Sequence, residues 1–149
     1  MKKTHIVILA GLFALAGAAA YAVGAHTPSP PGTATLHVSL GGVAGQKGTL
    51  MGAICKQESF LKQCEYFSVQ PALAAHELNF AGVAPGTYAV MVFHDENNNG
   101  KLDQASNGMP LEGYGFSRNA RGHWGPPSFE AARFDIKPGA NDIALDMVY

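Results

Sequence analysis

The stretch VFHDENNNGKLDQ, residues 92–104, carries three asparagines and three acids in a chain in which only 14% of residues are charged. If Asp95 is taken as position one, oxygen-bearing side chains recur at positions three, five and nine, which are Asn97, Asn99 and Asp103. Ca²⁺ takes six to eight hard oxygen ligands at about 2.3–2.6 Å, and alternate residues of a tight turn can supply them. The spacing therefore predicts a calcium-binding loop of the form DxNxNGxLD.

The remaining positions of the loop fit this pattern only in part. Gly100 at position six permits a sharp reversal, Lys101 at position seven offers its carbonyl, and apolar Leu102 follows. Position twelve is Ser106 in place of the bidentate glutamate of an EF-hand, so the missing carboxylate has to come from Glu112 farther along. Asparagine at two ligand positions lowers the ligand charge, so we expect weak affinity, about 0.1–1 mM.

Two other interpretations of this region stay open. Asparagine and aspartate also form turns by bonding their own backbone, so the stretch would then be a metal-free turn that caps a strand. Alternatively, His94, Asp95 and Glu112 could surround a metal-bound water, which would make the chain a metal-dependent hydrolase. No GxSxG or HExxH motif accompanies these residues. We therefore expect a structural role for His94 and no enzymatic activity.

The elements that must position the loop are predicted to be strands. Residues 88–94 form a nearly continuous apolar run after a Pro-Gly turn signal, which is typical of a strand buried on both faces. Residues 134–147 alternate in polarity around Pro138 and Gly139, which predicts a hairpin. Further strands are predicted at residues 33–40, 49–55, 65–69 and 76–80. Short strands without a convincing amphipathic helix predict an all-β fold, a single antiparallel β-sandwich of the transthyretin or immunoglobulin type.

Residues 105–129 do not fit the rhythm of short strands and predict a long ordered loop inserted in the sandwich. This segment is rich in glycine, proline and aromatic residues, and we expect its glycines to hold Tyr114 and Phe116 in a tight bend. We favour burial of its aromatic side chains, which include Trp124 and Phe129, because large aromatics dominate cores. In the alternative, Tyr114, Phe116 and Trp124 form an exposed binding surface for sugar rings or an apolar partner.

The N-terminus predicts export. Residues 1–22 read as a signal peptide, with two lysines, an uncharged apolar core and a small-x-small cleavage pattern. The apolar core, residues 6–20, is short for a membrane span, although an uncleaved anchor stays open as the alternative. Residues 23–32 read as a flexible spacer rich in proline, and residues 33–149 as one β-sandwich domain. We expect a mature chain without a transmembrane segment, located in the periplasm or secreted.

The two cysteines, Cys55 and Cys64, both fall in the predicted exported part. In an oxidising compartment a disulfide between them is the default, and a pair of unlinked buried thiols is the alternative. No basic patch is present, and loss of the two leader lysines makes the chain more acidic than its net charge of −1. Nucleic acid is therefore not expected as a partner.

Taken together, these segments resemble domain-of-unknown-function family 2141, which comprises exported bacterial proteins with one β-rich domain. The motifs that carry the resemblance are FHDENNNGKLD, EGYGFS and GPPSF. The entry into the central strand at Pro85-Gly86-x-Tyr88 is also similar to prealbumin-like and collagen-adhesin B-type sandwiches, which often place a DxNxNGxxD loop after that strand. The resemblance implies a fold and calcium binding, but no activity.

The sequence thus predicts an exported, non-enzymatic module that is calcium-binding through Asp95, Asn97, Asn99, Lys101, Asp103 and Glu112. In this hypothesis the ion orders residues 104–129, and the ordered surface binds an envelope protein or a glycan. The rival hypotheses are the hydrolase and a purely structural envelope protein with a metal-free loop.

Overall fold

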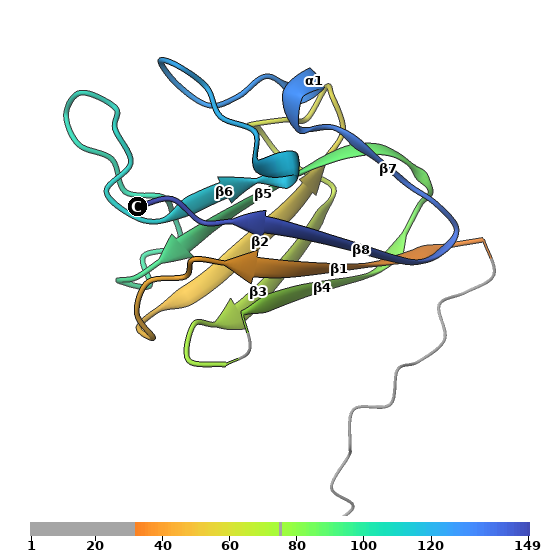
Figure 1. Cartoon of the computed structure of the whole chain (residues 1–149), viewed down its shortest axis with the longest axis horizontal. Coiled ribbons are helices and arrows are strands. Elements are labelled where there is room, and N and C mark those ends of the chain that lie inside the picture. The colour runs from red at the N-terminus through yellow and green to blue at the C-terminus, as the bar shows by residue number, and fades with distance from the viewer. Residues whose placement is uncertain (1–31, 75) are drawn as a thin grey trace, which may run out of the picture.

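Two β-sheets packed face to face make up the fold, as predicted for an all-β sandwich (Figure 1). The structure is a computed structural model that describes residues 32–74 and 76–149. The predicted signal peptide, residues 1–22, and nearly all of the predicted spacer, residues 23–32, lie outside the described residues.

The first sheet has three strands in the order β4-β1-β8. Their bounds are Ala34–Gly41 for β1, Glu77–Val83 for β4 and Gly139–Asp146 for β8. Strand β1 pairs with β4 in antiparallel fashion, but it pairs with β8 in parallel along its whole length. The predicted sandwich is therefore confirmed, although its pairing is not antiparallel throughout.

The second sheet has the order β3-β2-β5-β6, and β7 pairs with the beginning of β5. The bounds are Thr49–Cys55 for β2, Tyr66–Pro71 for β3, Gly86–Asp95 for β5, Tyr114–Phe116 for β6 and Phe134–Ile136 for β7. The short helices η1, Ser117–Asn119, and α1, Phe129–Ala132, follow β6 and precede β7.

Strand β5 is central in its sheet, as its apolar sequence predicts. Its alternate residues Tyr88, Val90 and Val92 point into the core between the two sheets. On its other face Ala89 belongs to a second apolar cluster, built from the 56–64 loop, η1 and α1. Burial on both faces explains why the strand needs almost no polar residue before Asp95.

Residues 134–147 do not form the predicted hairpin, and that prediction was wrong. Strand β7 joins β5 in one sheet, whereas β8 crosses to the other sheet and pairs in parallel with β1. The side chain of Asn141 fixes the crossing: its amide donates to the carbonyls of Lys137 (2.7 Å) and Thr35 (3.3 Å), and its oxygen accepts from the Lys137 N–H. The bonds to Lys137 close the turn between β7 and β8, and the bond to Thr35 ties β8 to β1.

The expectation of a tight bend around Tyr114 and Phe116 was also wrong, because both residues lie in β6. Gly113 and Gly115, which lie beside them, allow other parts of the chain to pack closely. A Cβ atom on Gly115 would lie 2.7 Å from Leu145 Cδ1, and one on Gly113 would overlap the ring of Tyr149. The two glycines therefore allow β8 and the C-terminus to lie directly against β6.

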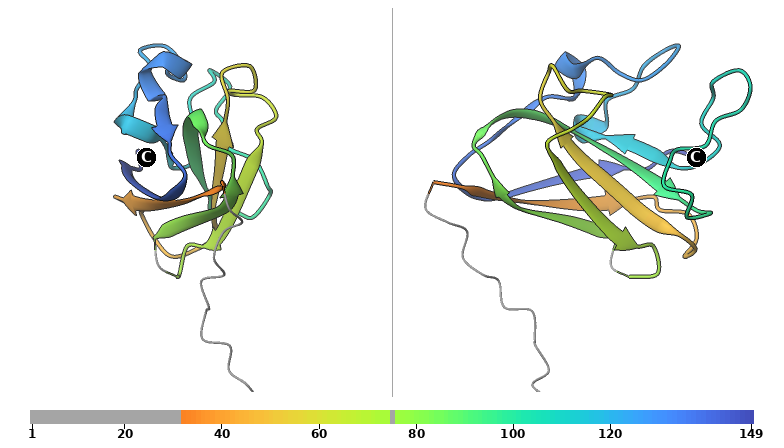
Figure 2. Two further views of the ribbon diagram at one scale, coloured as in Figure 1. Left: turned by 90° about the vertical axis from the view of Figure 1, so that its right-hand side faces the viewer. Right: turned by 180° about the vertical axis from the view of Figure 1, so that it is seen from behind.

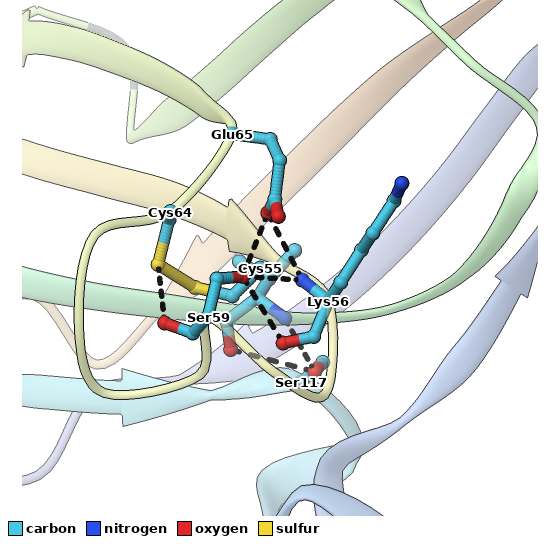
Figure 3. Close-up of a disulfide and its surroundings, with 7 residues drawn as sticks. Cys55, Lys56, Ser59, Cys64, Glu65 and Ser117 are labelled. Atoms are coloured by element: carbon cyan, nitrogen blue, oxygen red, sulfur yellow. Dashed lines mark hydrogen bonds between the residues drawn. A yellow bond between two sulfur atoms is a disulfide. The ribbon is translucent and has the colours of Figure 1, made fainter.

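The disulfide between Cys55 and Cys64 is confirmed, with a Cα–Cα distance of 4.5 Å (Figure 3). It closes the loop that follows β2, and both sulfur-bearing side chains are buried. Within this loop the carboxylate of Glu65 accepts from the backbone N–H of Lys56 (3.0 Å) and from the hydroxyl of Ser59 (2.9 Å). The disulfide and these bonds hold Phe60 against the outer face of the second sheet.

Candidate functional site

The end of β5 places His94 and Asp95 on opposite faces of the sheet, because successive side chains of a strand alternate. His94 lies on the same face as the core residue Val92, and only 1% of its surface is exposed. Its Nδ1 lies 2.7 Å from the Tyr149 hydroxyl and its Nε2 lies 2.6 Å from the Lys47 carbonyl. Both ring nitrogens are thus engaged inside the sandwich.

The hydrogen bonds of His94 define one chain of donors and acceptors. A carbonyl only accepts, so Nε2 carries the hydrogen and donates to Lys47. In the neutral ring Nδ1 then accepts from the Tyr149 hydroxyl, whose oxygen accepts from the Ala44 N–H at 3.0 Å. These hydrogen bonds tie Tyr149 to the loop between β1 and β2. The structure does not bring the His94 ring to Asp95 or Glu112.

Residues 95–103 form a compact loop whose side-chain oxygens turn inward to backbone N–H groups. The two carboxylate oxygens of Asp95 accept from the N–H groups of Asn99 (3.0 Å) and Gly100 (2.7 Å). The Asn97 oxygen accepts from the Asn99 N–H, and the Asn99 oxygen accepts from the Lys101 N–H, each at 3.0 Å. Gly100 takes φ +80°, as the predicted reversal requires.

Asp103 completes the loop and joins the predicted ligands to one another. Its Oδ2 accepts from the amides of Asn97 (2.6 Å) and Asn99 (2.8 Å). The hydrogen bonds from Asn99 and Asn97 hold the pKa of the Asp103 carboxyl below its usual value. The side chains of the loop therefore converge and do not splay into solvent.

Glu112 reaches back to the loop, as the sequence predicts. Its Oε1 accepts from the Glu96 N–H and its Oε2 from the Asp103 N–H, both at 2.9 Å. The pairing of Phe93 with Tyr114 places Glu112 on the same outer face of the sheet as Asp95. One carboxylate thus fastens the beginning of the loop to its end.

The electrostatics of this site differ from those of an ordinary surface turn. Asp95 is 2% exposed and Glu112 is 6% exposed, and neither forms a salt bridge with any of the described residues. Backbone N–H groups alone compensate these two buried negative charges. The donor set consists of carboxylate, amide and carbonyl oxygens, which suits a hard cation and not a transition metal. Over residues 32–74 and 76–149, no group of three or more His, Cys, Asp or Glu side chains is placed to hold a metal.

A short hairpin follows the loop, and sequence analysis missed it. Residues 103–111, here called the finger, are held by the bonds Leu111 N–H to Asp103 O and Ala105 N–H to Met109 O, both at 2.8 Å, and by a bridge between Gln104 and Pro110. The signal that could have revealed the finger is the Asn107-Gly108 pair at its tip, a frequent hairpin turn.

The aromatic residues of the 105–129 segment divide into buried and exposed groups. Phe116 and Phe129 are buried and each packs edge-on against Phe60, so the burial prediction is confirmed for both and Phe116 is no part of a binding surface. Tyr114 is half-buried. Trp124 is fully exposed, so its predicted burial was wrong.

In a comparison with known families, the DUF2141 family, described as "Uncharacterized protein conserved in bacteria", matches residues 38–144. The matched span begins within β1 and ends within β8, so it covers both sheets and the 95–112 site. Neither a curated protein nor a solved structure matches the chain. Within residues 32–74 and 76–149, no helix is long and apolar enough to cross a membrane.

Proposed function

The chain belongs to the DUF2141 family, and from this premise we propose that it is an exported, non-enzymatic β-sandwich module whose 95–103 loop binds Ca²⁺. The ligands are the oxygens of Asp95, Asn97, Asn99 and Asp103, the Lys101 carbonyl and the Glu112 carboxylate. A non-enzymatic role is supported by the position of His94, whose ring nitrogens both bond inside the sandwich.

The observation that carries the calcium proposal is the burial of Asp95 and Glu112 without a cationic partner among the described residues. A buried charge is costly unless it is paired, hydrogen-bonded or bound to a metal. The N–H groups that bond these carboxylates compensate part of that cost, and each carboxylate oxygen keeps a second lone pair. A divalent cation at the mouth of the loop would use those lone pairs.

The role of the ion would be to stabilise the base of the finger. Asp103 belongs both to the loop and to the first rung of the finger, and Glu112 fastens Asp103 to Glu96. Ligation of both carboxylates would therefore resist separation of the two ends of the loop. The finger and the segment that follows it would then present a fixed surface to an envelope protein or a glycan.

Export is supported by two features outside the loop. The disulfide between Cys55 and Cys64 is expected in an oxidising compartment and not in the cytosol. The leader pattern of residues 1–22 agrees with such a location. Proteins of the bacterial periplasm and cell surface meet both conditions.

Titration calorimetry with CaCl₂ tests the proposal, with the variant Asp95→Asn/Asp103→Asn beside wild type. We expect wild type to bind in the weak range of extracellular modules, about 0.1–1 mM. At a calcium concentration about twenty times Kd, wild type should gain about 1.8 kcal/mol of stability, which raises Tm by several degrees. The double variant should show neither effect.

The matched control is Glu96→Gln, which removes one carboxylate from the same loop without touching a proposed ligand. This variant should bind calcium as wild type does, apart from a small electrostatic weakening. Equal heats and equal calcium-dependent Tm changes in wild type and the double variant would refute the calcium proposal. The chain would then be a β-sandwich whose loop is a metal-free turn.

A further inference from the structure

Two loops project from the same side of the sandwich (Figures 1 and 2). One is the finger, residues 103–111, which follows the proposed calcium loop. The other comprises residues 121–126, here called the Trp loop, and lies between η1 and α1. The views agree that the two loops extend beyond the body of the two sheets.

The Trp loop is anchored at both ends and sharply turned at its tip. Ala120 before it and Pro127 after it are buried, whereas every residue between them is exposed. A Cβ atom on Gly122 would lie 2.0 Å from the Gly125 carbonyl oxygen, so only glycine permits this close reversal. The turn leaves the indole of Trp124 with a relative exposure of 102%.

The finger presents two further apolar side chains to solvent. Met109 is 63% exposed and Leu111 is 67% exposed, although both lie in a segment with regular cross-strand hydrogen bonds. Its residues 104–111 include no charged side chain. Large apolar side chains held outward on two rigid loops mark a surface that is covered by a partner or by lipid.

Two arginines, Arg118 before the Trp loop and Arg121 at its start, lie beside acids that bond other groups: the Asp146 carboxylate accepts from Asn119 (2.9 Å) and Glu130 pairs with Arg133 (2.6 Å). No Asp or Glu occurs between Glu112 and Glu130, whereas Arg118, Arg121 and His123 lie in that interval. Neither arginine forms a salt bridge within the described part of the chain. Their guanidinium groups instead reach backbone carbonyls, of Arg133 at 3.4 Å and of Asp146 at 3.1 Å. Two arginines without a salt bridge among the described residues thus lie close in sequence to the exposed tryptophan.

We propose that the finger and the Trp loop together bind the surface of an anionic phospholipid bilayer. Tryptophan favours the interface between headgroups and acyl chains, and Met109 and Leu111 would enter the acyl boundary beside it. Arg118 and Arg121 would meet the phosphates, where each basic residue adds to the attraction. A glycan-binding surface would use the face of the indole. It would leave the two aliphatic side chains, and the guanidinium groups that form no salt bridge, without a role.

This inference goes beyond calcium binding and does not depend on it. The proposed lipid contacts are Met109, Leu111, Arg118, Arg121 and Trp124, and none of these residues is a proposed calcium ligand. Vesicle titrations in the presence of a chelator therefore test the lipid surface alone, and calorimetry without vesicles tests the calcium loop alone. A failure of either proposal leaves the other standing.

Trp124 is the only tryptophan of the chain, so its fluorescence reports directly on the Trp loop. Vesicles made of phosphatidylcholine and phosphatidylglycerol in equal parts should shift its emission to shorter wavelength and protect it from acrylamide quenching. Pure phosphatidylcholine should bind more weakly, and high salt should weaken binding to the anionic vesicles. All variants keep the full chain, so the N-terminal residues contribute equally to each.

Three variants assign the binding to this surface. Arg118→Asn with Arg121→Gln should lower the partition coefficient about 25-fold, which is about fivefold per arginine. Asparagine suits position 118 because the residue there has φ +60°. Met109→Ser with Leu111→Ser should lower partitioning about tenfold or more. The matched control is Leu73→Ser, which removes a 70% exposed leucine from the turn after β3, on the opposite side of the molecule (Figure 1).

Several outcomes would overturn the proposal. Unchanged Trp124 emission with anionic vesicles is the most direct of them. Equal losses in the Leu73 control and in the loop variants would show that binding is not specific to this surface. A spectral shift with soluble oligosaccharides but not with vesicles would assign Trp124 to sugar stacking. Thermal unfolding of each variant verifies that a loss of binding is not a loss of fold.

Discussion

Replacing Glu112 by glutamine tests the idea that one buried carboxylate holds the 95–103 loop closed. The carboxylate accepts from the N–H groups of Glu96 and Asp103 at 2.9 Å each, and Glu112 is 6% exposed. Glutamine keeps one acceptor oxygen, but it turns an NH₂ group toward the other N–H donor. A hydrogen bond to a charged group contributes about 1.5–3 kcal/mol, and an unsatisfied buried donor adds its desolvation cost. Glu112→Gln should therefore lower the free energy of unfolding by about 2–3 kcal/mol.

Urea denaturation with a chelator present measures this loss, and Glu96→Gln is the matched control. Glu96 carries the same chemical group in the same loop, but its side chain is exposed. Its substitution should change stability by no more than about 0.5 kcal/mol, as is usual for surface positions. If Glu112→Gln also stays within about 0.5 kcal/mol, the carboxylate does not hold the loop and the reasoning fails.

Hydrogen exchange locates the effect within the molecule. If the loop opens locally, the Asp103 and Glu96 amides should exchange faster in Glu112→Gln, whereas amides in the centre of β5 should follow only the global stability. Uniformly faster exchange would instead mean that the substitution weakens the whole sandwich. The two patterns separate a clamp on the loop from a general packing role.

Three further outcomes are expected. Asn99→Asp removes an amide that donates to Asp103 and adds a second negative charge. The free energy of unfolding in chelator should therefore fall, while the calcium-dependent rise in Tm should become larger. A metal-free turn would show only the loss of stability. Cys55→Ala with Cys64→Ala opens a short loop and should lower the free energy of unfolding by about 2–3 kcal/mol in urea denaturation, provided the chain-entropy account holds. The His37 ring forms a hydrogen bond with Glu77 at 2.9 Å, and this bond raises the pKa of His37 above 6.5. Desolvation lowers that pKa in part, and Asp142 raises it further. The protonated His37 ring is 35% exposed, so its interaction with these carboxylates should add about 0.5 kcal/mol to the free energy of unfolding. This contribution should be complete below pH 6.5 and be lost as pH rises through the raised pKa of His37. In a plot of stability against pH, His37→Gln should flatten that region.

The strands were predictable because their side chains alternate, but their partners were not. Period two in residues 33–40 is a local property, and β1, Ala34–Gly41, covers nearly the same residues in the structure. The same pattern in residues 134–147 shows which side chains face the core, but not which sheet each half joins. The bonds of Asn141 to Lys137 and Thr35 decide that the chain crosses between sheets. The pairing of β8 with β1, to which the Asn141–Thr35 bond belongs, joins residues far apart in sequence and leaves no local pattern.

The candidate site was predictable where spacing reflects one turn of backbone. Asp95, Asn97 and Asn99 face inward because alternate residues of a tight loop do so, and Glu112 reaches them because β6 pairs beside β5. The exposure of Trp124 was not predictable from its type. It accompanies the close reversal between Gly122 and Gly125, which leaves Trp124 at the tip of the Trp loop.

The hydrogen bonds of the loop also revise how an ion would act on it. Asp95, Asn97, Asn99 and Glu112 each bond a backbone N–H of residues 96–103, so the fold of the loop is determined by the protein's own groups. An ion that had to order the whole 104–129 segment would lose much of its binding free energy to chain entropy. Because the finger and β6 have their own hydrogen bonds, calcium would act on an arranged loop and the cost would be small. Calcium binding should then show almost no heat-capacity change, whereas ordering of a disordered segment would give a large negative one.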